Sequence, residues 1–334
     1  MKPARVAVLG GGRSSEHEVS LASAASVSAG LRDAGYEPIP IEVGRDGVWR
    51  RDGGSEVAVR PGRGLEGVDV VFPVLHGPFG EDGTVQGLLE CLGIPYVGAG
   101  VLASALCMDK VMFKELMGYV GLPQVPYRAV TAESLALDRA GVLGGIGALG
   151  LPVFVKPARL GSSVGIVRVV SAEDLPGALE TAFEHDALAI VEAAARGLEV
   201  ECSVIGNGNP IASEPGEIVL AAGEAGWYDY EAKYTPGGMQ LVVPARVPSW
   251  VRERIQSVAI EAFRRAGCSG LARADFFVEG ERVLLNELNT MPGFTSTSVF
   301  ASLFEASGVA YAELLDRLVQ LAFDRHAAGQ RHRH

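Results

Sequence analysis

The chain has 334 residues, 48% of them hydrophobic and 21% charged, a balance typical of a soluble globular protein with two or three domains. Its formal net charge of -11 argues against a nucleic-acid-binding surface. No apolar stretch is long enough to cross a bilayer and no signal peptide is visible, so we expect no membrane partner and a cytoplasmic location. The four cysteines lack CxxC spacing, which favours reduced, buried thiols.

The amino-terminal part alternates strands and helices. The run at 68–75 is almost entirely apolar, as expected of a buried parallel strand. We therefore predict a parallel α/β domain over residues 1–102, with ligands at the carboxyl ends of its strands. The predicted strands are 5–9, 36–43, 68–75 and 94–97, and the predicted helices are 18–31 and 84–92.

The loop at 10–15 follows the first strand and allows three interpretations. It carries part of a dinucleotide-binding glycine fingerprint without the third glycine, and Glu42 lies where a ribose ligand is expected. Its backbone amides, together with Glu16, suit a substrate amine or carboxylate equally well. In the simplest interpretation, Ser15 and Glu18 form only a helix capping box.

A second glycine-rich loop follows the apolar strand, with the sequence His76-Gly-x-x-Gly80-Glu81-Asp82-Gly83. A single histidine usually has a structural role. Here the histidine is presented at the tip of a buried strand, where ligands of α/β sheets bind, so a ligand-binding role is favoured.

The middle segment, residues 103–187, carries a second group of candidate phosphate ligands. Lys156 ends an apolar strand, and lysine is rarely buried unless it meets an anion. The following loop at 161–165 contains Ser162 and Ser163 and supplies amides and hydroxyls that can close over phosphates, although an ordinary hairpin turn is the alternative. The predicted elements are a helix at 108–119 that contains Lys110, strands at 152–157 and 165–170, and a helix at 174–183.

The remaining segment, residues 188–334, is rich in β-strand patterns. Glu192 and Glu199 bracket the short segment between two of these strands, and either can accept hydrogen bonds from adenine or ribose, although solvated charges are the simpler interpretation. The long irregular stretch at 215–244 mixes glycines, aromatics and a lysine, which favours a mobile cover over a loop that serves only for packing. Strands are predicted at 190–192 and 199–205, and helices at 250–266 and 311–322.

Two further apolar strands, joined by a turn around Glu279-Gly280, carry a set of oxygen ligands. Alternation places Asp275 opposite Glu287 and Arg273 opposite Asn289 if the turn is tight, although the register could slip by a residue or more. Buried carboxylates need a compensating cation. All-oxygen ligation suits Mg²⁺, which usually also binds substrate phosphates, so these strands indicate an enzyme that uses a nucleoside triphosphate.

Together these motifs resemble the D-alanine–D-alanine ligases of the ATP-grasp superfamily, over essentially the whole chain and in the family's order. The motifs are Ser15-Glu-His-Glu-Val-Ser20, His76-Gly-Pro-Phe-Gly-Glu-Asp-Gly83, Met108-Asp-Lys110, Lys156-Pro with Gly161-Ser-Ser-Val-Gly165, Tyr228-Asp-Tyr-Glu-Ala-Lys-Tyr234, Arg273-Ala-Asp275 and Glu287-Leu-Asn-Thr-Met-Pro-Gly293. The resemblance implies an α/β fold with an amino-terminal parallel domain, a small central α+β domain, and a carboxy-terminal α+β domain with an antiparallel sheet. ATP would be held between the last two.

The resemblance also implies the residues that handle the nucleotide. Two Mg²⁺ or Mn²⁺ ions bridging the phosphates would be held by Asp275, Glu287 and Asn289. ATP itself would be bound by Lys110, Lys156, Ser162, Ser163, Glu192, Glu199, Trp227, Lys233, Asn286 and Glu287. The small residues in Glu192-Ala-Ala-Ala195 depart from the family, which commonly has a bulkier side chain near the adenine.

The implied reaction joins two D-alanine molecules through an acyl phosphate. Glu16 would receive the ammonium group of the first D-alanine, and His76 would lie near its carboxylate. Arg273 and the Gly293 amide would stabilise the tetrahedral oxyanion. Ser298 would bind the carboxylate of the second D-alanine. The catalytic residues Glu16, Ser162 and Tyr234 would connect the amino-terminal domain, the phosphate loop and the cover.

Alternatives remain at this point. A D-alanine–D-lactate or D-alanine–D-serine ligase is the nearest, and Tyr234 argues against the lactate form. A nicotinamide-dependent oxidoreductase rests on the loop at 10–15 and on Glu42, but leaves Asp275 and Lys156 unexplained. A non-catalytic nucleotide-binding protein is the third alternative. A homodimer is the family expectation for the oligomeric state.

Overall fold

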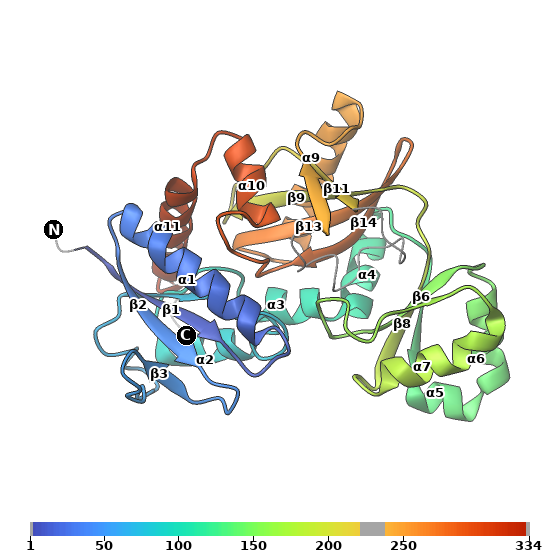
Figure 1. The fold of residues 1–334 in the computed structure, drawn as a ribbon, viewed down its shortest axis with the longest axis horizontal. Coiled ribbons are helices and arrows are strands. Elements are labelled where there is room, and N and C mark those ends of the chain that lie inside the picture. Colours follow the sequence, from blue (N-terminus) through green and yellow to red (C-terminus); the bar gives the residue numbers. More distant parts are fainter. Residues whose placement is uncertain (1–2, 221–237, 332–334) are drawn as a thin grey trace.

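The computed structural model describes residues 3–220 and 238–331. In these ranges the strands form three separate sheets. Figure 1 shows three lobes, with the amino-terminal lobe in blue at the left, the central lobe in green at the right, and the carboxy-terminal lobe in yellow and orange above and between them. Within the same ranges, no helix combines the length and apolar character needed to cross a bilayer.

The amino-terminal sheet has the order β3-β2-β1-β4. Strand β1 is parallel to β2 and to β4, which confirms the predicted parallel α/β fold. The predicted strand at 94–97 is wrong, because only an isolated bridge joins Tyr96 to Val71. The elements are β1 (Arg5–Gly11), α1 (His17–Asp33), β2 (Glu37–Val43), the antiparallel edge strand β3 (Trp49–Arg51), β4 (Val70–Pro73) and α2 (Thr84–Leu92).

The central sheet is antiparallel in the order β5-β8-β6-β7, and three α-helices belong to this lobe (Figure 1). Alternate residues of its strands, among them Val153, Val155 and Val191, pack into one apolar cluster with α7. Because β8 pairs with β5 and β6, residues 188–193 belong to this sheet and not to the carboxy-terminal one. The elements are β5 (Tyr127–Thr131), α5 (Ala132–Leu137), α6 (Arg139–Gly147), β6 (Val153–Pro157), β7 (Val167–Val169), the 3-10 turn η1 (Ala172–Asp174), α7 (Leu175–Phe183) and β8 (Leu188–Ala193).

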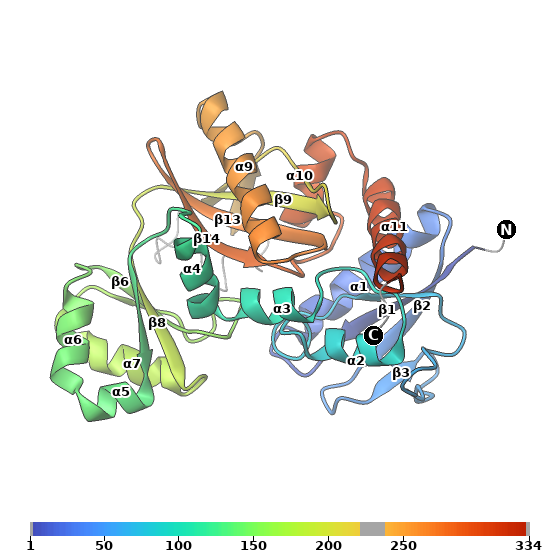
Figure 2. The ribbon, with the colours of Figure 1, turned by 180° about the vertical axis from the view of Figure 1, so that it is seen from behind.

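The carboxy-terminal sheet is antiparallel, with the order β12-β11-β9-β13-β14 and β10 beside β9. Helix α9 buries Val251, Ile255 and Phe263 in the cluster formed with β9, β13 and β14, and Figure 2 shows it lying across this sheet. The elements are β9 (Leu198–Gly206), β10 (Ile211–Ala212), β11 (Gly216–Leu220), β12 (Met239–Val242), α9 (Ser249–Arg265), β13 (Gly270–Glu279), β14 (Arg282–Asn289), α10 (Val299–Ala306) and α11 (Tyr311–Gly329).

Two helices, α3 (Val101–Met108) and α4 (Lys110–Tyr119), link the amino-terminal and central lobes. The sequence predicted one helix at 108–119, but Asp109 has an extended backbone and separates the two. Its side chain accepts hydrogen bonds from the amides of Val111 and Met112 and so caps α4. Lys110 is therefore the first residue of α4, and the cap by Asp109 fixes its position.

The last helix, α11, returns from the carboxy-terminal lobe to the amino-terminal one, and both ribbon views show it beside α1. Its residues Leu315, Leu318 and Val319 share one core with residues of β1, β4 and α1. Gly30 permits this close approach, because a Cβ there would lie 2.5 Å from Leu315 Cδ1. The two ends of the chain thus contribute to a single apolar core.

Candidate active site

Strands β13 and β14 bring four of the predicted residues together. Arg273 pairs with Asn289, and Asp275 pairs with Glu287, so the predicted register is confirmed. The pairing shifts immediately afterwards, because Phe276 faces Leu285 and Asn286 is left as an extra residue. Such a bulge changes where side chains point. Asn286 and Glu287 consequently both line the same cavity, although they are neighbours in the chain.

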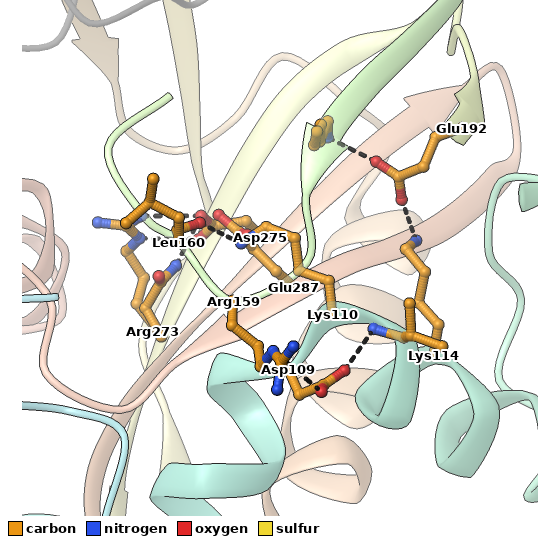
Figure 3. Close-up of polar contacts among 12 residues, drawn as sticks. Asp109, Lys110, Lys114, Arg159, Leu160, Glu192, Arg273, Asp275 and Glu287 are labelled. Carbon is orange, nitrogen blue, oxygen red and sulfur yellow. Dashed lines mark hydrogen bonds and ion pairs between the residues drawn. The ribbon is translucent and has the colours of Figure 1, made fainter. Parts of the chain in front are cut away.

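Arg273 forms a charged network at this strand pair. Its guanidinium donates two hydrogen bonds to Asp275, at 2.7 and 2.8 Å, and forms an ion pair at 2.8 Å with Glu201 of β9. Asn289 donates a 3.0 Å hydrogen bond to Asp275. Figure 3 shows Arg273, Asp275 and Glu287 close to Lys110. The sequence analysis did not select Glu201, and the signal it left was a carboxylate among the apolar residues of a central strand.

Lys110 reaches this network from the start of α4. Its Nζ donates a 2.7 Å hydrogen bond to the Leu160 carbonyl and lies 3.7 Å from Glu287 Oε2. Its own amide donates to the Ala158 carbonyl. The start of α4 is therefore hydrogen-bonded to the chain just before the loop at 161–165, the serine loop. This contact places the Lys110 ammonium group beside Glu287, a predicted metal ligand.

Lys156 and Glu192 meet on the central sheet, where β6 pairs with β8. The Lys156 ammonium lies 2.5 Å from Glu192, and a second ammonium, that of Lys114 on α4, lies 2.8 Å from the other carboxylate oxygen. Burial alone raises the pKa of Glu192, but the two ammonium charges outweigh it and hold that pKa well below its ordinary value. Burial lowers the pKa of Lys156, and the Glu192 charge more than compensates, so the net shift is upward. Figure 3 shows Glu192 above Lys114.

The serine loop connects the central and amino-terminal lobes. Ser162 and Ser163 have φ angles of 51° and 57°, in the left-handed region that non-glycine residues rarely adopt. The Ser162 hydroxyl donates a hydrogen bond to the Glu16 carboxylate. Such uncommon backbone angles concentrate at ligand-binding loops. The contact brings together two residues predicted to act in one site.

Two adjoining cavities contain the predicted residues that the structure describes. The smaller, of about 180 Å³, lies between the lobes, and the larger, of about 700 Å³, lies between the central and carboxy-terminal sheets. Both are lined by Lys110, Gly161, Ser162 and Glu287, so they meet at these residues. The smaller cavity is also lined by Glu16, His76, Arg273, Asn289, Gly293 and Ser298. The larger is also lined by Lys156, Ser163, Glu192, Glu199, Asp275 and Asn286.

His76 lines the smaller cavity, but both of its ring nitrogens form hydrogen bonds within the protein. Nδ1 donates to the Met291 carbonyl at 3.0 Å, and Nε2 accepts from the Ser23 hydroxyl at 3.2 Å. Burial lowers the pKa of the imidazole, against the opposing charge of Glu16. The neutral ring therefore connects the amino-terminal lobe to the backbone at residue 291, in addition to its place at the cavity wall.

The loop at 10–15 does not form the capping box. Helix α1 begins after Glu16, and no side chain caps its first turn. Instead, Ser14 donates a 2.7 Å hydrogen bond to the His76 carbonyl, and the His17 ring donates one of 2.7 Å to the Gly12 carbonyl. The two glycine-rich loops of the amino-terminal lobe are thus bonded directly to each other.

Glu81 is a residue of the cavity wall that the sequence analysis quoted only within a motif. It accepts a 2.8 Å hydrogen bond from the Gly77 amide and lines the smaller cavity. Burial, followed by the neighbouring charge of Glu16, raises the pKa of Glu81 to about 8. The cavity that holds the candidate substrate residues therefore also holds a carboxyl group that stays protonated near neutral pH.

This shift predicts a pH dependence of stability. Between 4.5, the ordinary pKa of a glutamate side chain, and the folded pKa of about 8, the folded protein binds a proton at Glu81 that the unfolded chain does not, so Glu81 makes the free energy of unfolding fall as pH rises. Glu81→Gln removes this contribution, and the variant should gain stability relative to the parent as pH rises from 5 to 8. Urea unfolding across this range is the measurement. Glu281→Gln, on an exposed turn, is the control. Parallel curves for parent and Glu81→Gln would contradict the expectation.

The predicted metal ligands suit a hard divalent cation in their chemistry. Asp275 and Glu287 are directly opposed carboxylates, with the Asn289 carboxamide beside them, which is an all-oxygen set. Arg273 and Lys110 supply the positive charge next to these carboxylates. Across residues 3–220 and 238–331, no three His, Cys, Asp or Glu side chains form a metal-binding group on their own.

Three predicted residues, Trp227, Lys233 and Tyr234, lie outside the described residues, together with most of the predicted cover at 215–244. The described ends of that segment form β11 and β12, which pair with each other. Glu217 of β11 is nearly fully buried and forms an ion pair at 2.6 Å with Arg246, at the edge of the larger cavity.

Comparison with known proteins gives a consistent family assignment. A family model described as D-ala D-ala ligase C-terminus matches residues 116–320, and one described as D-ala D-ala ligase N-terminus matches residues 5–60 and 55–99. The D-alanine–D-alanine ligase of Deinococcus radiodurans is 46% identical, over 96% of this chain and 98% of that protein. That of Mycobacterium ulcerans is 44% identical, over 96% of both chains.

Solved structures agree with this. The D-alanine–D-alanine ligase from Coxiella burnetii superposes with a TM-score of 0.86 at 34% identity, over 98% of this chain and 97% of that one. The VanG D-Ala:D-Ser ligase from Enterococcus faecalis superposes with a TM-score of 0.85 at 36% identity, over 96% and 99%. The mixed α/β fold with three sheets is therefore that of these ligases, and a nicotinamide-dependent oxidoreductase is excluded. The chain belongs to the D-alanine–D-alanine ligase family.

Proposed function

We propose that this enzyme joins two D-alanine molecules to D-alanyl-D-alanine, with conversion of ATP to ADP and phosphate, to supply a peptidoglycan precursor. The observation that supports this best is the meeting of the two cavities at Lys110, Ser162 and Glu287. The larger cavity has the size for a nucleotide, and Lys110 and Lys156 line it as candidate phosphate ligands. The smaller one suits two amino acids, and the γ-phosphate would lie where the two cavities join.

In the first step, a carboxylate oxygen of the first D-alanine attacks the γ-phosphorus of ATP. The bond between that phosphorus and the ADP oxygen breaks, which gives an acyl phosphate and ADP. Lys110 and Lys156 would hold the phosphates as compact positive charges. Glu16 would hold the ammonium group of the first D-alanine. The hydrogen bond from Ser162 keeps the Glu16 carboxylate beside the serine loop.

In the second step, the free amine of the second D-alanine attacks the carbonyl carbon of the acyl phosphate. The carbonyl oxygen gains negative charge, phosphate then leaves with the carbon–oxygen bond pair, and the amine loses a proton. Arg273 and the amide of Gly293, which both line the smaller cavity, are the proposed donors to this oxygen. The 2.8 Å pairing with Glu201 would hold the guanidinium in place.

Asp275, Glu287 and Asn289 would hold two Mg²⁺ or Mn²⁺ ions. When bound, these ions would neutralise charge on the phosphates during the transfer. Arg273 and Lys110, which now contact the same carboxylates, would remain close to the reacting groups.

We propose three domains that follow the sheets: residues 1–102, a central domain that extends to the end of β8 near 193, and a carboxy-terminal domain from β9 onward. The pairing of β8 with β5 and β6 supports a second boundary near 193 in place of the predicted 187. ATP would bind between the last two domains. We also propose that the enzyme is a cytoplasmic homodimer, which sedimentation of the purified protein and fractionation of cells would test.

Ser298→Ala is expected to raise the KM for the second D-alanine roughly 10- to 100-fold, with little change in the KM for ATP. Ser298 lines the smaller cavity at the start of α10, where a hydroxyl and a helix amino terminus suit a carboxylate. A hydrogen bond to a charged group is worth about 1.5–3 kcal/mol. Ser307→Ala, at the other end of the same helix, is the control. Unchanged D-alanine kinetics in Ser298→Ala would remove Ser298 from the site.

The direct test of the function measures ADP release with D-alanine alone, with D-alanine plus D-serine, with D-alanine plus D-lactate, and without an acceptor, and identifies each product. We expect ADP and D-alanyl-D-alanine with D-alanine alone. A mixed product as the main outcome would instead support a D-serine or D-lactate ligase, and the likeness to a D-Ala:D-Ser ligase makes the D-serine arm necessary. Nucleotide binding without turnover would indicate a non-catalytic protein.

A further inference from the structure

Lys114 is a buried cation that the proposed reaction does not use. It lies on α4, one turn after Lys110, and its side chain is 1% exposed. The chain has five lysines in total, at positions 2, 110, 114, 156 and 233, and arginine provides its other fixed cations. Because an ammonium group is costly to bury without a partner, a lysine in this position needs a reason.

The contacts of Lys114 identify its partner. Its Nζ lies 2.8 Å from Glu192 Oε1, whereas Lys156 takes the other oxygen at 2.5 Å. Each carboxylate oxygen of Glu192 thus pairs with a different ammonium group. Lys156 and Glu192 line the larger cavity, and Lys114 lies behind its wall. Two ammonium groups and one carboxylate leave a net charge of one positive unit on this trio, and Lys156 is its member with an ammonium group at the cavity.

We propose that Lys114 is a positioning residue that holds Glu192 from behind, so that Lys156 can leave Glu192 and bind a nucleotide phosphate. The inference rests on the proposed nucleotide role of the larger cavity. With Lys114 present, Glu192 keeps an ion-pair partner when Lys156 turns to the phosphate. Without it, departure of Lys156 would leave a buried carboxylate unpaired, which is strongly unfavourable. Lys156 would then stay with Glu192, and its positive charge would not be available to the phosphate.

The test measures the binding of ATP and of adenosine by calorimetry, in the absence of D-alanine. Lys114→Met, which keeps the shape of the side chain without its charge, is expected to weaken ATP binding about tenfold and adenosine binding less than twofold, because only ATP needs Lys156. The KM for ATP should rise by the same factor, with kcat at saturating ATP within about threefold of the parent value. Arg265→Met, which breaks an exposed pair with Glu261 on α9, is the control for loss of one cation.

A double-mutant cycle separates positioning from a general structural role. In Glu192→Gln no carboxylate charge holds Lys156 away from the ligand. The double variant Glu192→Gln with Lys114→Met should therefore bind ATP as tightly as Glu192→Gln alone. The comparison of Glu192→Gln with the double variant remains decisive if Lys114→Met alone does not fold. Equal loss of ATP and adenosine binding, or the same tenfold loss in the Glu192→Gln background, would overturn the proposal. These binding measurements need no D-alanine. A failure of the proposed ligase function, seen as no activity of the parent protein in the ligase assay, is therefore distinguished from a failure of this inference.

Discussion

Glu287→Gln is expected to abolish ADP formation while the protein stays folded. Glu287 faces Asp275 across the strand pair, lies 3.7 Å from Lys110, and lines both cavities at their junction. Glutamine keeps the size of the side chain but removes the negative charge that would hold a cation on the phosphates. Loss of several kcal/mol of charge stabilisation corresponds to a fall in turnover of roughly 10³-fold or more.

The measurement is the rate of ADP release with saturating ATP and D-alanine over a series of Mg²⁺ concentrations. Glu279→Gln, at the far end of the same strand pair and in an ion pair with Arg282, is the matched control and should keep the parent rate. Circular dichroism and thermal unfolding check that both variants fold. Near-normal turnover of Glu287→Gln in saturating Mg²⁺ would refute the assignment of Glu287 as a metal ligand.

Arg273→Lys is expected to lower kcat for dipeptide formation by about 10²- to 10³-fold, the usual effect of removing one donor to an oxyanion. A lysine keeps the charge between Asp275 and Glu201, so the two carboxylates do not lose their cation. It cannot reproduce the planar fork that bonds Asp275 twice and still points a donor at the substrate. The KM for ATP should change little.

The proposed order of steps makes this prediction specific. Arg273 is assigned to the attack of the amine on the acyl phosphate, so the first turnover of ADP should survive in Arg273→Lys while dipeptide appears slowly. Rapid-quench measurement of both products distinguishes the steps, and Arg265→Lys on the exposed face of α9 is the control. A rise in KM alone, with kcat unchanged, would show that Arg273 binds substrate without acting on the oxyanion.

Much of the site was predictable because its residues lie in short, strongly patterned segments. The alternation in β13 and β14, with a tight turn between them, was enough to place Asp275 opposite Glu287. The bulge at Asn286 was not predictable, since an extra residue in one strand depends on how both strands pack. The strand at 94–97 was wrongly predicted for a related reason, because its apolar residues pack beside the sheet with only one bridge to it.

Residues whose role depends on distant partners were missed. Glu201, Glu81 and Lys114 each look like an ordinary charge in the sequence. Their importance comes from burial and from partners far along the chain, such as Arg273 for Glu201 and Glu192 for Lys114. Local pattern does not reveal the partner that makes a buried charge tolerable.

The sequence by itself determined the alternation of strands and helices in the amino-terminal part, the glycine-rich loops, the facing positions of Asp275 and Glu287 and, through the order of its motifs, the family. These depend on backbone preferences and side-chain periodicity within a few residues. Only the tertiary structure decided that α11 returns to the amino-terminal core, that β8 completes the central sheet, and that one carboxylate, Glu192, is shared by two lysines. Each of these depends on contacts between segments far apart in the chain, where burial and charge compensation outweigh local preference.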